Sequence, residues 1–310
     1  MTTKAKGYLL GAIAAATYGM NPLFALPLYE DGMNPDSVLF FRYLFAIPVL
    51  GIMIKARGRS FALKKREIPL LAIFGILFAL SSLTLFQSYN YMDAGIASTM
   101  LFVYPIMVAV IMACFFRERL SAVTIICILT AMCGIGLLYK GSDGATLSLA
   151  GTMLVLGSAL SYAIYIVGVN RTRLRDVATL KVTFYVLLFG LALFAARLIA
   201  DGEVAIPGKW YLWGNVIALG LFPTAISLLC TTTAIQYIGS TSTAILGALE
   251  PATAILFGVT VFGETLTLRD IAGVVLIIAA VGIVVAGSSA ARMPLGLRKM
   301  FPRLTHDKKE

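Results

Sequence analysis

Long apolar stretches dominate the chain and determine its expected architecture. Ten segments of 18 to 28 residues are almost wholly apolar: 7–29, 37–54, 68–91, 95–116, 121–139, 147–169, 178–200, 210–237, 241–262 and 271–289. A helix needs roughly 20 such residues to cross the hydrocarbon core of a bilayer. None of the segments alternates apolar and polar residues as outer-membrane strands do. The pattern therefore predicts an all-α polytopic membrane protein with ten transmembrane helices.

Composition supports a lipid environment and excludes several function classes. Hydrophobic residues make up 59% of the chain and charged residues only 13%, too few charges for a soluble surface of this size. The four cysteines have no paired spacing and no nearby histidine, so we expect neither disulfides nor a metal site. We also expect no cofactor, because no motif for one is present. The partners expected are the lipid bilayer and a small-molecule substrate, while the oligomeric state is left open.

The net charge of +10 acts as an orientation signal rather than as a sign of nucleic-acid binding. With ten spans both termini lie on one side of the membrane. Placing them in the cytoplasm puts 20 of the 25 Lys and Arg residues inside and five outside. This imbalance predicts cytoplasmic N- and C-termini and a basic cytoplasmic tail over 291–310.

The two halves of the chain resemble one another. Pairs of like residues recur at a spacing of 144 or 146, including Gly7/Gly151, Tyr18/Tyr162, Tyr91/Tyr237, Pro105/Pro251 and Glu118/Glu264. The pairing divides the chain into a first repeat, 1–143 with spans 1–5, and a second repeat, 144–290 with spans 6–10. Because five is an odd number, the second repeat is inverted relative to the first. Inverted repeats are typical of transporters that work by alternating access, with the substrate site between the halves.

The recurring Pro-to-Glu pattern resembles the drug/metabolite transporter superfamily, specifically its ten-span EamA-type members. The resemblance rests on Tyr104-Pro105 with Phe115 to Leu120, and on Leu249-Glu250-Pro251 with Phe262 to Leu266. It covers about 290 residues. Within the family the chain looks most like bacterial exporters of amino acids, including aromatic ones. The resemblance implies a plasma-membrane protein whose spans 1, 3, 4, 6, 8 and 9 line a central cavity, with spans 5 and 10 at the periphery.

Glu250 is the only ionisable group expected deep in the membrane. Three further charges, Arg42, Lys181 and Arg197, lie near segment ends, where a long side chain can reach the headgroups. A deep carboxylate can bind a positively charged group of a substrate that crosses the membrane. The alternative is a structural role at the Pro251 kink, because the equivalent residue in the first repeat is uncharged.

Polar and aromatic residues in the spans complete the candidate substrate site. The predicted site residues are Tyr18, Asn21, Ser82, Phe86, Gln87, Asn90, Tyr104, Tyr162, Tyr165, Thr231, Glu250 and Thr253. The aromatic side chains suit an apolar substrate group, and the polar ones favour an aqueous route. Packing between helices is the alternative for each of them.

Prolines within the spans are the other candidate feature, because each frees a backbone carbonyl. The carbonyls expected to be free are those of Tyr18, Leu101, Leu219 and Gly247. They could accept from a substrate ammonium group, or the kinks could only bend the helices.

The resemblance implies a transporter that exports amino acids. Facilitated diffusion is the expected mechanism, since the single His306 lies in the tail and a lone carboxylate gives no support for proton coupling. The alternative substrate is a cationic or amphipathic drug-like metabolite. A channel would favour a continuous polar stripe, and a membrane-embedded enzyme would need a catalytic constellation that the spans lack, so we expect no enzyme.

Overall fold

The computed structural model describes residues 3–117, 122–139, 148–201 and 203–290. The predicted tail 291–310 and Glu118 of the first Pro-to-Glu pattern lie outside the described residues. The helices are α1 Thr3–Gly19, α2 Asn21–Glu30, α3 Pro35–Ala56, α4 Ile68–Ser88, α5 Ala94–Leu101, α6 Tyr104–Phe116, α7 Ala122–Tyr139, α8 Leu149–Arg171, α9 Thr179–Asp201, α10 Leu212–Gly220, α11 Ser227–Leu246, α12 Leu249–Phe262 and α13 Leu268–Ala290. A 3₁₀ turn, Arg173–Asp176, and a π-helical segment, η2 Leu221–Ile226, complete the described secondary structure.

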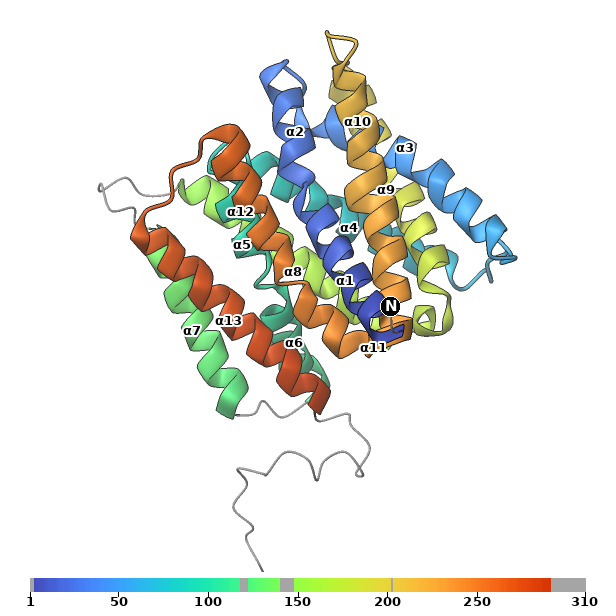
Figure 1. Ribbon diagram of the computed structural model, residues 1–310. Helices are drawn as coiled ribbons and strands as arrows, with labels where there is room; N and C mark the ends of the chain where they lie inside the picture. Colours follow the sequence, from blue (N-terminus) through green and yellow to red (C-terminus); the bar gives the residue numbers. More distant parts are fainter. Residues whose placement is uncertain (1–2, 118–121, 140–147, 202, 291–310) are drawn as a thin grey trace, which may run out of the picture.

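The all-α class is confirmed, and each of the ten apolar segments is helical within the described ranges. Seven helical stretches there are both long and apolar enough to cross a membrane, and the apolar helices α7 and α12 are shorter. Many large apolar side chains face outward, as expected for helices surrounded by lipid. The chain is therefore a polytopic helical bundle (Figure 1).

Prolines determine where the spans break. Span 1 is divided at Met20, span 4 at Phe102 and Val103, and span 9 begins its long part after Gly247 and Ala248. A proline follows each break within three residues, and its missing N–H removes a helical hydrogen bond. In consequence the fourth span of each half is broken at the same place in the repeat.

The connection predicted between spans 8 and 9 differs from the structure. Residues 238–240 were expected to join two helices, but α11 continues through them to Leu246. The physical reason is that no proline or left-handed residue interrupts this stretch, whereas Pro251 breaks the helix further on. In span 8 Pro223 does not end the helix either, because the π-helical segment η2 accommodates it.

The bundle consists of two groups of helices and a peripheral pair. In the first group, α1 packs along α11 and α12, while α2 and α3 contact α10. In the second group, α4 packs along α8 and α9, and α8 also contacts α5 and α6. The groups meet where α5 lies against α12 and where α3 lies against α9. Figure 1 shows α7 and α13 side by side at one edge of the bundle, the place expected for spans 5 and 10.

Two of the charges expected to reach the headgroups have protein partners instead. The Lys181 ammonium donates to the carbonyl of Ala62. Arg197, near the end of α9, forms an ion pair with Asp36 in the first turn of α3. Both are near helix ends as predicted. Lys181 ties α9 to the loop between α3 and α4, and Arg197 ties α9 to α3.

Candidate functional site

Aromatic side chains from three helices form one continuous cluster. The ring of Tyr104, at the start of α6, lies 4.7 Å from that of Tyr162 in α8, edge to face. Tyr162 stacks on Tyr165 at 5.9 Å, and Phe78 of α4 lies 5.3 Å from Tyr165. Edge-to-face and offset rings of this kind are favourable arrangements. Three of the predicted aromatic residues therefore lie together at the broken part of span 4.

Phe78 is a member of this cluster that the sequence analysis missed. It lies one helical turn before Ser82 on α4, so it occupies the same helix face as a predicted site residue. Tyr43 of α3 joins the cluster through Phe78 at 6.3 Å and hydrogen-bonds with Ser82 at 2.8 Å. Its spacing of four residues from Ser82 could have identified Phe78 in the sequence. No sequence feature indicated Tyr43.

Glu250 lies beside the aromatic cluster, in the first turn of α12, and is half-buried. Its carboxylate is close enough to interact electrostatically with the hydroxyls of Tyr18, Tyr104 and Tyr162. The close approach of α1 to α12 explains this position, because a Cβ atom on Gly19 would lie only 2.4 Å from the Glu250 carbonyl oxygen. Among the described residues no basic side chain lies within ion-pair distance of Glu250.

Arg42 corrects the expectation that its side chain reaches the headgroups. The residue is only 5% exposed and points into the bundle from α3. Its Nε donates to Thr224 Oγ1 at 3.2 Å, and its guanidinium carbon lies 5.4 Å from the centre of the Phe86 ring. Glu250 is therefore not the only charge enclosed by the bundle. The apolar pattern held no signal for this role of Arg42, because the residue lies near a helix end.

Most of the carbonyls expected to be free already accept a hydrogen bond. The side-chain amide of Asn21, a buried residue, donates to the Tyr18 carbonyl at 2.8 Å. Leu219 accepts from Thr224 Oγ1 at 3.4 Å, and Gly247 accepts from the Glu250 backbone at 2.9 Å. The kinks therefore mainly shape the helices, which was the alternative reading of these prolines.

The other predicted site residues are scattered around the cluster. Phe86 is fully buried beneath Arg42, and Thr253 lies one turn beyond Glu250, where its hydroxyl donates to the Leu249 carbonyl at 2.7 Å. Gln87 is half-buried at the end of α4, and Asn90 is exposed just after it. Thr231 is half-buried on α11. The structure does not bring these last three residues into the aromatic cluster.

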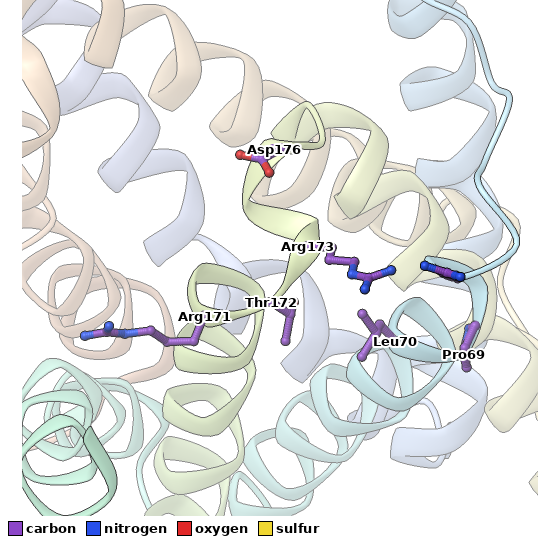
Figure 2. A pocket seen from close by; sticks show the side chains of 7 residues that line it. Pro69, Leu70, Arg171, Thr172, Arg173 and Asp176 are labelled. Carbon is purple, nitrogen blue, oxygen red and sulfur yellow. The ribbon is translucent and has the colours of Figure 1, made fainter. Parts of the chain in front are cut away.

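A basic pocket of about 780 Å³ lies further along α4 and α8. It is lined by Arg66, Pro69, Leu70, Arg171, Thr172, Arg173 and Asp176. Figure 2 shows Arg173 extending toward Leu70, whereas Arg171 points away from it. At 1.5 Å of rise per residue, Leu70 and Arg171 are about 9–12 Å along their helices from Phe78 and Tyr165. The pocket thus lies on the predicted cytoplasmic side of the aromatic cluster.

At the opposite end a carboxylate joins the two helix groups. Glu264, just after α12, accepts a hydrogen bond from the Ala94 backbone N–H at 3.0 Å, in the first turn of α5. Burial and the charge of Asp93 raise the pKa of the Glu264 carboxyl. Burial and the charge of Asp270 likewise raise the pKa of Asp93. The second Glu of the Pro-to-Glu pattern thus caps a helix of the other half.

The model of one protein family matches almost the whole chain. It is described as the EamA-like transporter family, and it matches twice, over residues 5–140 and 149–286. The chain belongs to the EamA-like transporter family. It is therefore a multi-pass membrane transporter, and the resemblance to the drug/metabolite transporter superfamily is confirmed.

Similar proteins are described as transporters. An uncharacterized transporter of Archaeoglobus fulgidus is 31% identical over 251 residues, covering 81% of this chain and 86% of the relative. An uncharacterized inner membrane transporter, YicL of Salmonella typhimurium, is 27% identical, covering 91% and 95%. A solved crystal structure with 20% identity matches with a TM-score of 0.65, covering 93% of this chain and 98% of the other, and shows the fold alone.

Proposed function

We propose that this EamA-like transporter exports amino acids, including aromatic and other apolar ones, from the cytoplasm by facilitated diffusion. The proposal rests on the aromatic cluster beside Glu250, where Tyr104 and Tyr162 could hold an apolar side chain and the carboxylate an ammonium group. We place the protein in the inner (plasma) membrane with both termini in the cytoplasm, as the distribution of basic residues predicts.

Contacts between the two halves support alternating access through an inverted repeat. A Cβ atom on Gly7 would lie 2.8 Å from the Cβ of Tyr237, and one on Gly151 would lie 3.0 Å from the Cβ of Tyr91. These four positions are the pairs that the repeat relates, Gly7 with Gly151 and Tyr91 with Tyr237. The two family matches, over 5–140 and 149–286, agree with the same division. Two equivalent halves give a carrier two similar conformations that open to opposite sides.

The transport proposal is tested by flux in proteoliposomes. Purified protein is reconstituted, and efflux of radiolabelled Phe, Thr and Met and of a quaternary ammonium dye is followed with and without a pH gradient. We expect amino-acid flux down its own gradient that does not require a pH difference. Flux of the dye alone would favour the alternative, export of cationic or amphipathic metabolites. Absence of amino-acid flux would overturn the proposal, and flux only with a pH gradient would overturn facilitated diffusion. Rapid, unsaturable flux would indicate a channel.

Glu250→Gln tests the carboxylate at the site. The substitution keeps the size of the side chain but removes its charge, so we expect Phe flux to fall about tenfold or more, with expression unchanged. Glu203→Gln, in an exposed loop, is the matched control and should retain wild-type flux. Full activity of Glu250→Gln would instead assign Glu250 a structural role at the kink.

A further inference from the structure

Arg42 has an unusual position for a membrane arginine. Of the described Lys and Arg residues it is the only buried one, with 5% of its surface exposed. No carboxylate among the described residues lies within ion-pair distance of it. A guanidinium stays charged at physiological pH, and burying one without an anion is costly. Arginines within membrane segments are retained mainly where they bind something.

The surrounding residues hold the guanidinium in one place. The π-helical segment η2 presents the Thr224 hydroxyl to Nε, and the Phe86 ring lies against the guanidinium. The end of α10 packs directly on the backbone here, since a Cβ atom on Gly220 would lie 3.0 Å from the Arg42 carbonyl oxygen. Of the guanidinium nitrogens, Thr224 engages Nε. The planar group therefore keeps N–H donors for a ligand.

Arg42 is joined to the aromatic cluster through the next residue of α3. The Tyr43 ring lies 6.3 Å from that of Phe78. Arg42 and Glu250 come from α3 and α12, and they do not form an ion pair with each other. A buried cation and a half-buried anion thus do not neutralise each other directly.

We propose that Arg42 binds the carboxylate of the substrate, so that the site selects compounds that carry a carboxylate, such as α-amino acids, over simple cations. The assignment rests on the proposed export function and specifies how that site recognises its substrate. An arginine fork matches a carboxylate with two parallel hydrogen bonds. The aromatic cluster of Phe78, Tyr104, Tyr162 and Tyr165 then takes the side chain. A simple cation would be repelled by Arg42, which distinguishes this site from one for cationic drugs.

Three related compounds test the assignment in proteoliposomes. Phenylalanine carries both charges, phenethylamine only the ammonium group, and 3-phenylpropionate only the carboxylate. In Arg42→Gln we expect Phe flux to fall tenfold or more, because hydrogen bonds to charged groups are lost, while phenethylamine flux is unchanged or higher. Arg42→Lys keeps the positive charge but loses the two parallel N–H donors of the guanidinium. Its Phe flux should therefore lie between those of the wild type and Arg42→Gln. Lys181→Gln removes an ammonium that donates to the Ala62 carbonyl, outside the aromatic cluster; it is the control and should keep wild-type selectivity.

A binding measurement separates this assignment from the export proposal and does not depend on transport. We expect 3-phenylpropionate to raise the thermal midpoint of the detergent-solubilised wild type and not that of Arg42→Gln. If the wild type moved no Phe but showed this difference in stabilisation, the export proposal would fail and the role of Arg42 would stand. Equal stabilisation of both proteins, no stabilisation of either, or an equal loss of flux for all three compounds in both Arg42 variants would overturn it.

Discussion

Two carboxyl groups, those of Glu264 and Asp93, lie at the first turn of α5, outside the membrane-spanning segments. Burial is the main cause that raises the pKa of each of these carboxyl groups from its ordinary value. An acid with a raised pKa binds its proton more strongly in the folded protein than in the unfolded chain. Its contribution to stability is therefore full below the ordinary carboxyl pKa and is lost as pH rises toward the raised value.

This dependence of stability on pH leads to a prediction for Asp93→Asn. The wild-type thermal midpoint in detergent should fall as pH rises above the ordinary carboxyl range, and the fall should be smaller in the variant, which lacks one titrating group and its repulsion of Glu264. The measurement is the difference in midpoint between the two proteins from pH 4.5 to 7.5. Asp176→Asn, in the turn after α8, is the control. A constant offset between wild type and Asp93→Asn at every pH would contradict the prediction.

The residues of the site were partly predictable from the sequence. Tyr104, Tyr162 and Glu250 were candidates because of their depth and their repeat positions, and the structure brings them together. Arg42 could not be identified, since its distance from a helix end does not say which face of α3 is covered by α10 and η2. Asn90 was selected for its polarity, but it lies in the exposed turn after α4. The sequence shows the chemistry of each side chain, whereas the direction in which a side chain points depends on how the helices pack.

At the scale of elements, prolines made the broken spans predictable but not their exact form. The sequence indicated a kink at Pro22, and the structure divides α1 from α2 there. The amide of Asn21 satisfies the Tyr18 carbonyl at this break, which hydrophobic patterning could not have revealed. Pro223, in contrast, is accommodated by a π-helical segment, because the Thr224 hydroxyl bonds to the Leu219 carbonyl.

The break between α1 and α2 predicts different effects for two asparagines. Asn21 and Asn170 each donate to a carbonyl of the preceding turn, at 2.8 and 2.9 Å, but Asn21 is buried and Asn170 is exposed. Asn21→Ala should destabilise the protein by about 1 kcal/mol, since losing the Tyr18 bond is partly offset by removing its own unpaired oxygen. Asn170→Ala should change stability by less than about 0.5 kcal/mol. The two variants are compared by their thermal midpoints in detergent. Equal shifts of the midpoint in both would contradict the role of Asn21.

At the scale of the whole molecule, the sequence predicted the fold class and the ten helical segments. It did not predict how the helices divide into groups, because apolar helices in lipid show no clear inner face. Contacts supply the division: α1 with α11 on one side, α4 with α8 on the other, and α5 against α12 where the groups meet. If transport moves one group against the other, contacts within a group persist and the α5–α12 contact must open.

Paired cysteines distinguish these two kinds of contact. Gly95 and Ile255 lie across the α5–α12 junction, where a Cβ atom on Gly95 would be 3.1 Å from the Ile255 Cα. Gly7 and Tyr237 lie within the first group, with Cβ atoms 2.8 Å apart once Gly7 carries one. Both spacings are near enough for a disulfide after a small shift. In a background without the four native cysteines, oxidation of Gly95→Cys/Ile255→Cys should stop flux, and a reducing agent should restore it.

The control pair, Gly7→Cys/Tyr237→Cys, should form its disulfide and retain flux within about twofold, because both positions move together. Crosslinking is measured by a gel shift on the reconstituted protein, and flux on the same sample. Continued transport with the 95–255 bond fully formed would mean that α5 and α12 stay together through the cycle. A block by the 7–237 bond would mean instead that α1 and α11 separate, and either result would require a different division of the bundle from the one that its contacts indicate.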